Sequence, residues 1–282
     1  MDSNVKEPPS NSEKAQPTSS SLEVKTHNLF QPCWFAWIIG AGHFGTLAAR
    51  RISKRHPGEK ILVVDQDFEK FRELEPLPVK TLEEDAQEFL QENLSVKIQP
   101  QESEKVQPIF SCTGVATEHL LQPCWFSDAP KWVIPAVPIH VAFEWLFNTL
   151  RKDENLEVER LNVPEEADKQ VPNPFRMSRE TLYASFADFV CPDNCSEPAD
   201  ICTKTKEPRK GNLYEVLAKI DVSGFTPLVL RSHQLAPGVG GYTPESMNKL
   251  LHRVLETPGK YLIATSCRCH GVIDALSWQK KA

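Results

Sequence analysis

Three glycines in the first fifth of the chain have the spacing of a turn that binds phosphate. An apolar run, residues 36–39, is followed by Gly40, Gly42 and Gly45 at the beginning of a helical pattern. The first glycine allows a tight turn after a strand, the second lets the backbone approach a pyrophosphate, and the third lets the helix pack on the sheet. Free N–H groups and the positive end of the helix dipole stabilise the anion. The spacing therefore predicts a dinucleotide site.

A carboxylate follows where such a site holds the adenosine ribose. Asp65 comes directly after a second apolar run, residues 61–64, and can accept hydrogen bonds from ribose hydroxyl groups. No arginine or lysine lies between Asp65 and Lys70, which favours NAD over NADP. A small-residue turn after a predicted strand, residues 109–112, would approach the same cofactor. The residues expected to contact the dinucleotide are Gly40, Gly42, His43, Phe44, Gly45, Asp65, Thr113 and Gly114.

Plainer interpretations remain open for both turns. The glycines could belong to a Rossmann-like fold that has lost its ligand, in which they serve turn geometry alone. The turn at 113–114 could be an ordinary strand-to-helix connection capped by Thr117.

Five of the eight cysteines fall in two short loops far apart in the chain. The loops contain Cys191, Cys195 and Cys202, then Cys267 and Cys269. Each loop adjoins a predicted regular element, so we expect the loops to meet and to ligate one metal ion, with His270 as a reserve ligand. A closed tetrahedral set of thiolates is typical of structural zinc, and four thiolates also hold a [4Fe–4S] cluster. The spacing within the loops is standard for neither centre.

Zinc is favoured slightly over the cluster, and two other interpretations stay open. The cysteines could carry out thiol redox chemistry, or they could bind nothing. A cysteine left unligated in the second loop would lie beside Arg268, whose charge would lower the thiol pKa.

Two histidines and one arginine lie in predicted turns that suit acid–base or anion chemistry. His140 follows a proline-rich turn after a strand at 132–134, while Arg231 and His233 begin a glycine loop after a strand at 227–230. An imidazole titrates near neutrality, which suits proton transfer. His140, His233 and Arg231 are therefore the catalytic candidates. Structural histidines and glycines needed only for the turn are the alternative.

The composition argues against several classes of partner. The formal net charge is −6, whereas nucleic-acid and anionic-membrane partners favour a basic surface. No apolar run reaches the roughly 18 residues of a membrane helix, and the first residues lack the apolar core of a signal peptide. We expect a cytoplasmic protein whose cysteines are reduced. The substrate is unknown, and a homo-oligomer remains open.

The order of predicted elements indicates an α/β protein with two domains. We expect a disordered tail at 1–28, a Rossmann-like doubly wound parallel sheet at 29–150, a charged linker at 151–171 and a smaller α/β metal-bearing module at 172–282. The predicted helices, besides the one after the glycines, are 67–74, 82–94, 141–150, 213–220 and 244–255, the last capped by Thr243. A final strand is expected at 260–265.

Residues 36–67 resemble the NAD-binding TrkA-N domain of potassium-uptake regulators, and equally the first βαβ unit of many dehydrogenases. The Cys-rich module resembles no characterised family. The dehydrogenase resemblance implies an NAD(H)-binding oxidoreductase, here with a cysteine-ligated metal site. The TrkA-N resemblance implies the alternative, a non-catalytic regulatory protein that senses NAD(H) or redox state.

Overall fold

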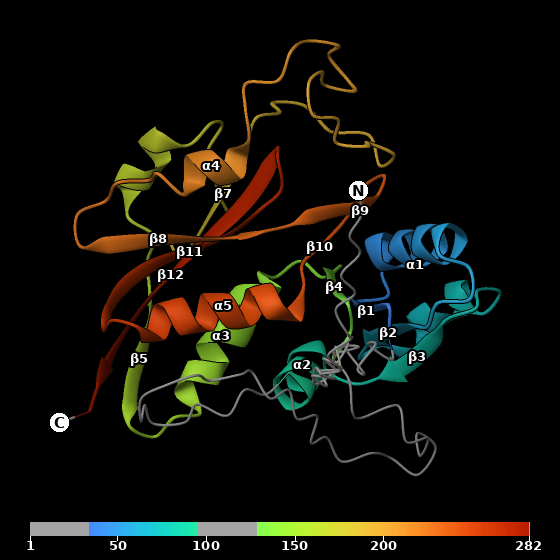
Figure 1. The fold of residues 1–282 in the computed structure, drawn as a ribbon, viewed down its shortest axis with the longest axis horizontal. Helices are drawn as coiled ribbons and strands as arrows, with labels where there is room; N and C mark the ends of the chain where they lie inside the picture. Colours follow the sequence, from blue (N-terminus) through green and yellow to red (C-terminus); the bar gives the residue numbers. More distant parts are fainter. Residues whose placement is uncertain (1–33, 95–128, 282) are drawn as a thin grey trace, which may run out of the picture. The chain divides into compact units, whose positions relative to one another are not determined.

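Two β-sheets organise the described part of the chain, which comprises residues 34–94 and 129–281 of a computed structural model (Figure 1). The first sheet is parallel and has the order β3-β2-β1-β4. Its strands are β1 (Ala36–Ile39), β2 (Ile61–Asp65), β3 (Lys80–Glu83) and β4 (Trp132–Pro135). All residues of β1 and β2 are buried, as expected for a parallel sheet covered on both faces. The predicted parallel βαβ unit is thus confirmed.

Helix α1 (His43–Arg55) connects β1 to β2 and packs on the sheet through small side chains. Ala48, Ala49 and Ile52 are buried against β1 and β2. Gly45 makes this close packing possible, because a Cβ atom at this position would lie 1.9 Å from the Gly40 carbonyl oxygen. The third glycine of the fingerprint therefore has the packing role that its spacing predicts.

The elements after β2 differ in detail from the sequence prediction. The helix expected at 67–74 forms as a 3-10 helix, Phe68–Leu74, which the Asp67 side chain caps at Glu69. The helix expected at 82–94 is shorter, because its first residues pair with β2 as strand β3. Helix α2 (Ala86–Asn93) begins only after Asp85, whose carboxylate accepts the N–H groups of Gln87 and Glu88. Residues 109–112 lie outside the described chain.

The second sheet is mixed, with the order β6-β7-β12-β11-β8, and β5 also pairs with β12. Its strands are β5 (Leu156–Leu161), β6 (Phe175–Arg176), β7 (Thr181–Ser185), β8 (Phe225–Arg231), β11 (Gly259–Ser266) and β12 (His270–Lys280). Strands β8 and β11 are parallel and are joined through helix α5 (Pro244–Leu255), which confirms the predicted strand–helix–strand unit. The Thr243 side chain caps α5 at Ser246, as expected.

Three strands of this sheet, β5, β6 and β12, lie where the sequence indicated none. Residues 151–171, expected to be a linker, contain β5, which pairs with β12. The first residues of β5 alternate between more and less buried positions, and Leu156 is buried. Strand β12 itself pairs with β5, β7 and β11. Its middle, residues 273–276, is buried on both faces, so it lacks the simple alternation of a strand with one exposed face.

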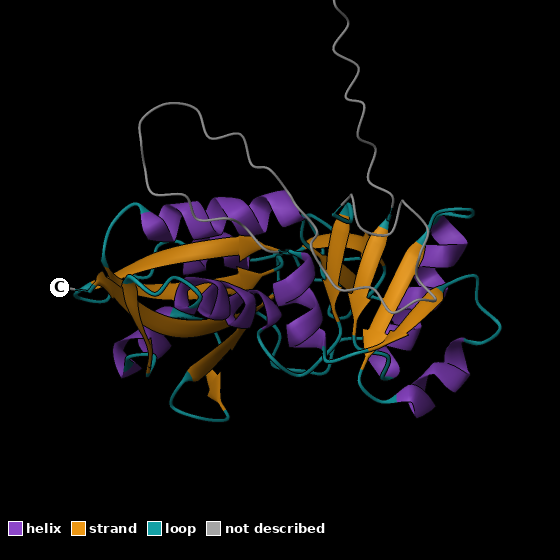
Figure 2. Ribbon diagram, turned by 90° about the horizontal axis from the view of Figure 1, so that it is seen from below, coloured by secondary structure: helices purple, strands orange, loops and turns teal. Residues whose placement is uncertain are grey.

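Helices cover both faces of the second sheet (Figures 1 and 2). Helix α3 (Val141–Arg151) and α5 pack on one face with Tyr261 and Ile263 of β11. The short helix α4 (Leu213–Leu217) packs on the other face with Leu262 and Ala264. The α3 side of this core is continuous with side chains of the parallel sheet, including Trp37 and Val64.

A β-hairpin replaces the glycine loop expected after β8. Strands β9 (His233–Ala236) and β10 (Val239–Gly241) form it, and its buried side chains pack against α1. The next residue, Tyr242, exchanges backbone hydrogen bonds of 2.8 and 3.0 Å with Val133 of β4. The hairpin therefore connects the parallel sheet to the second half of the chain, and Pro32–Ala282 form one unit by their contacts.

The fold is therefore α/β, with a four-stranded parallel sheet and a mixed sheet. Among residues 34–94 and 129–281, no helix combines the length and apolar character needed to cross a bilayer. The tail predicted at 1–28 lies outside the described residues.

Replacing Gly45 by alanine is expected to lower the free energy of unfolding by about 1–3 kcal/mol, because the added methyl group overpacks the contact between α1 and Gly40. Gly42→Ala is the matched control: its Cβ meets nothing within 4 Å, and the cost at a helix N-cap is at most about 1 kcal/mol. Urea unfolding followed by circular dichroism measures both. Equal losses of stability would argue against the close helix–strand contact.

Candidate functional site

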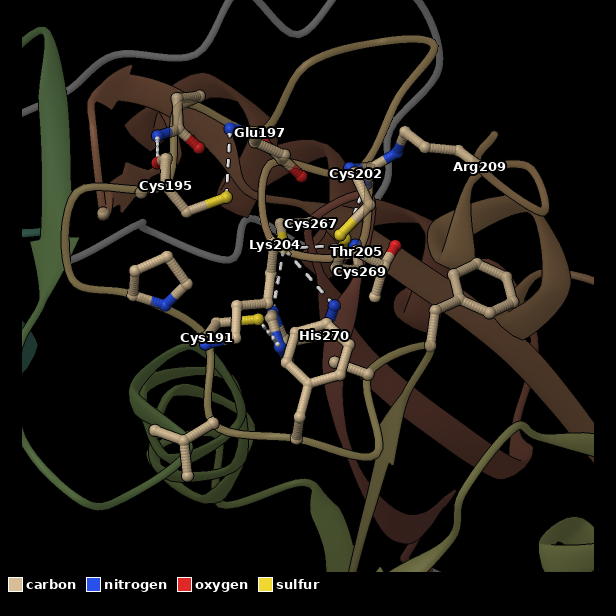
Figure 3. A pocket seen from close by; sticks show the side chains of 18 of the residues that line it. Cys191, Cys195, Glu197, Cys202, Lys204, Thr205, Arg209, Cys267, Cys269 and His270 are labelled. Carbon is tan, nitrogen blue, oxygen red and sulfur yellow. Dashed lines mark hydrogen bonds between the residues drawn. The ribbon is translucent and has the colours of Figure 1, made fainter. Parts of the chain in front are cut away.

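A pocket of about 690 Å³ lies where the two cysteine loops meet (Figure 3). The structure brings five free thiols to its wall: Cys191, Cys195, Cys202, Cys267 and Cys269. His270, Glu197 and Arg209 also line it. Loops separated by more than sixty residues therefore share one cavity.

The second loop is a tight turn between β11 and β12. The Cys267 amide donates to the His270 carbonyl oxygen at 3.0 Å, which closes the turn. The Cys267 sulfur then accepts the backbone N–H groups of Cys269 and His270, each at 3.4 Å. Burial raises the pKa of the Cys267 thiol to about 12.

The first loop holds its cysteines in two further turns. The Cys195 sulfur accepts the Glu197 amide at 3.4 Å, and the Cys195 amide donates to Pro192 at 3.0 Å. Cys202 lies in the next turn, where hydrogen bonds from the Thr205 backbone and side chain lower the thiol pKa. Backbone amides thus face three sulfur atoms in three separate turns.

The His270 imidazole lies between the two loops (Figure 3). Its Nε2 is 3.6 Å from the Cys191 sulfur, and its Nδ1 is 3.9 Å from the Cys267 sulfur. Burial lowers the pKa of His270, which favours the neutral ring. Burial and the neighbouring thiols raise the pKa of Cys191.

Arg209, rather than Arg268, is the cation beside the second loop. An Arg209 guanidinium nitrogen donates to the Cys269 sulfur at 2.6 Å. Burial raises the pKa of Cys269, and Arg209 opposes that rise. The Arg268 side chain instead donates to the Asn212 amide oxygen at 3.0 Å, which holds it away from the thiols. The expected Arg268–thiol contact is therefore replaced by one that spans sixty residues of sequence.

The cysteines are close together but are not arranged as ligands. Within the described ranges, no group of three or more His, Cys, Asp or Glu side chains has a geometry that could hold a metal ion. A metal in this pocket would require the thiol groups to rotate.

The N-terminal end of α1 adjoins the same pocket. Phe44 is 60% exposed and contributes to the pocket wall. His43 Nε2 lies 3.3 Å from the Asp193 carboxylate. One Arg51 guanidinium nitrogen donates to both the Asp193 and the Pro237 carbonyl oxygens, each at 2.5 Å. Helix α1 is therefore tied to the first cysteine loop and to the hairpin turn.

The space beside the backbone at Gly42, the second glycine of the turn, is open. Gly40 has φ +106°, a conformation that favours glycine, and directs the chain from β1 toward α1. Gly42 is the N-cap residue of α1 and has no side chain with which to cap the helix. A Cβ atom added to Gly42 would have no atom within 4 Å apart from those of its chain neighbours and of the helix backbone. The first turn of α1 also contains no acidic residue. An anion could therefore approach these N–H groups.

Asp65 already has partners. Its carboxylate is buried and accepts the Ala41 and Asp67 amides at 2.8 and 2.9 Å, and Lys70 Nζ lies 3.1 Å away. Burial alone would raise the pKa of Asp65, but these amides and Lys70 lower it below its ordinary value. Lys70, five residues after Asp65, thus lies at the acid that we expect to bind ribose.

The three catalytic candidates are separated in the structure. His140 is buried outside the pocket, with Nδ1 2.7 Å from Asp274 and Nε2 2.8 Å from Thr265. His233 lines the pocket, and burial followed by the charge of Arg231 lowers its pKa. The Arg231 guanidinium stacks over the Tyr214 ring at 4.5 Å, away from the pocket wall.

The remaining residues of interest are two that were predicted to contact the dinucleotide and two pocket residues that were not predicted. Thr113 and Gly114 lie outside the described residues. Arg209 and Glu197 were not predicted as site residues, because each lies in a charged segment typical of a solvated surface. The carboxylate of Glu197 accepts the Arg268 amide, so it joins the two cysteine loops.

Comparisons with known proteins place the chain in a family. Residues 142–279 match a family model described as "Uncharacterized protein, C-terminal domain". A protein of Archaeoglobus fulgidus, named "Uncharacterized protein", is 30% identical over 244 residues, which cover 85% of this chain and 97% of the relative. No solved structure matches the chain. The chain belongs to the family of this archaeal protein.

These comparisons correct the resemblance to the TrkA-N domain. The matching family model covers residues 142–279 and leaves the glycine turn outside it, so the prediction of a TrkA-N domain at the N-terminus was wrong. The reason is that a glycine turn with a following acid recurs on many nucleotide-binding folds, and one βαβ unit does not identify a family.

In the metal-free chain, Cys202 is expected to react with iodoacetamide faster than Cys267 near neutral pH. A lowered pKa gives Cys202 more thiolate, whereas burial raises the Cys267 pKa to about 12 and limits access. The rise of the alkylation rate with pH should therefore be centred at a lower pH for Cys202 than for Cys267. Peptide mass spectrometry after timed alkylation measures both rates. Equal rates, or faster modification of Cys267, would be inconsistent with these environments.

Proposed function

We propose that this protein binds NAD(H) at the glycine turn and acts as an oxidoreductase whose reacting centre is the cysteine-lined pocket. The observation that carries the proposal is the position of Phe44. This residue lies in the first turn of α1, two positions after the N-cap Gly42, and also lines the pocket with the five thiols. A dinucleotide held at Gly42 would therefore lie next to redox-capable side chains.

The backbone at the start of α1 supports the dinucleotide part of the proposal. A Rossmann-like doubly wound sheet would hold its ligand outside the carboxyl ends of the strands, where β1 and β2 lead into Gly40 and Asp65. Gly42 is open, and the first turn of α1 itself contains no acidic residue that would compete with phosphate. Ribose could reach Asp65 if Lys70, whose side chain is 43% exposed, moved into solvent.

The pocket supports the redox part. His233 lines it and has a lowered pKa, so a neutral imidazole there can accept a proton near neutrality. The five thiols supply either direct thiol chemistry or ligands for zinc or a [4Fe–4S] cluster. The reaction class is the transfer of a hydride or electrons between nicotinamide and a small substrate, which the residues do not identify.

A non-catalytic NAD(H) or redox sensor is the second candidate, and one observation favours it. Both ring nitrogens of His140 are hydrogen bonded in the core, so this histidine cannot serve a bound nicotinamide without breaking contacts to Asp274 and Thr265. The bonds from Arg51 to Asp193 and Pro237 would carry a movement of α1 to the cysteine loop. A sensor would bind NADH but would not oxidise it, whichever electron acceptor is supplied.

Replacing Gly42 by valine is expected to weaken NADH binding, because the side chain would occupy the space where a pyrophosphate approaches the backbone. Binding is measured by isothermal titration calorimetry and by NADH fluorescence. We expect at least a tenfold loss of affinity with little loss of stability, since no atom lies within 4 Å of the added Cβ.

Ser53→Ala, on the exposed part of the same helix, is the matched control and should bind NADH like the wild type. A wild-type chain that binds neither NADH nor NAD at millimolar concentration would overturn the proposal. Unchanged binding by Gly42→Val would place the dinucleotide elsewhere.

A further inference from the structure

We propose that Cys191, Cys195, Cys202 and Cys267 form the thiolate ligand set of a single metal centre, and that Cys269 lies outside it. The occupant is a thiophilic metal, either Zn²⁺ or the iron of an iron–sulfur cluster. The proposal assigns ligands, and it stands whether or not the glycine turn binds a dinucleotide.

The first argument is the hydrogen bonding of three sulfur atoms. Cys195 accepts the amide of residue 197, and Cys267 accepts the amides of residues 269 and 270. The amides of residues 204 and 205 hydrogen bond to Cys202. In every case the donors lie two or three positions after the cysteine. Such N–H···S bonds favour the thiolate, which is the form that binds metal, and orient it.

The second argument is that the backbone of both loops is already fixed around the pocket. The Leu213 and Phe186 amides donate to the carbonyl oxygens of Arg268 and Cys269, each at 2.9 Å. On the other side, Gly238 donates to the Cys195 carbonyl oxygen at 2.8 Å. These bonds hold the backbone at Cys195, Arg268 and Cys269 in place beside the pocket that all five thiols line.

The fourth ligand is chosen from the surroundings of the two remaining cysteines. The Cys269 sulfur is engaged by the Arg209 guanidinium, which would have to leave before a cation could bind there. The Cys191 sulfur instead lies 3.6 Å from Nε2 of the His270 ring. Rotation of His270 would let Cys191 and Cys267, which flank the ring, approach a common ion. Arg209 would not contact the metal, and its positive charge would offset part of the negative charge of the thiolates.

The test is metal analysis of the full chain purified without oxygen, together with five single variants. Cys191→Ser, Cys195→Ser, Cys202→Ser and Cys267→Ser remove proposed ligands, and Cys269→Ser is the matched control from the same turn as Cys267. We expect stoichiometric zinc, or iron with sulfide, in the wild type and in Cys269→Ser. The four ligand variants should lose metal affinity by at least about 100-fold, since even outer-shell partners cost 10- to 100-fold.

A second measurement covers variants that fail to fold. Co²⁺ titrated into the metal-free wild type should give thiolate-to-cobalt charge-transfer bands, and Cys269→Ser should give the same bands. A wild type without zinc or iron that also gives no such bands would overturn the metal site. Loss of metal from Cys269→Ser with retention in Cys191→Ser would overturn the ligand assignment. Neither result depends on NADH binding, so failure here is distinguishable from failure of the proposed function.

Discussion

The turn at residues 267–270 is the constraint on which the candidate site depends. Its ends are fixed by the antiparallel pairing of β11 and β12, and its backbone is hydrogen bonded to Phe186, Leu213 and Glu197 from three other segments. The loop at 191–210 contains no helix or named strand, and it is held to this turn through Glu197 and Arg209 and to the hairpin turn through Gly238. The convergence of thiols is therefore a consequence of sheet pairing in the core, because β12 also pairs with β5 and β7. Loss of this central strand would separate the two cysteine loops.

The parallel sheet takes part in the site through helix α1 and the β9–β10 hairpin. Arg51 holds the Asp193 and Pro237 carbonyl oxygens to α1, and Tyr242 pairs with Val133 of β4. These contacts bring the open glycine turn and the thiol pocket to the same region within Pro32–Ala282. The proposals for dinucleotide and metal binding draw on this shared geometry, yet each uses different residues.

Local signals in the sequence predicted much of the fold, and long-range contacts account for what they missed. The spacing of Gly40, Gly42 and Gly45 and the cap at Thr243 act within one turn of helix, so the sequence alone identifies them. The contact of Arg209 with Cys269 joins residues sixty positions apart and has no local signature. Strand β12 escaped prediction because burial on both faces removes its alternation. The Asp65–Lys70 contact is local by comparison, because the 3-10 helix at Phe68–Leu74 brings Lys70 back to an acid only five residues earlier.

The central claim is that cysteines from distant loops share one pocket. The most direct measurement is cross-linking of the folded, metal-free chain with a short bifunctional thiol reagent, followed by peptide mapping. The account predicts cross-linked peptides that join Cys191, Cys195 or Cys202 to Cys267 or Cys269, and their loss when the chain is unfolded in urea before reaction. Cross-links confined to each loop, or links between the loops that persist equally in urea, would contradict it.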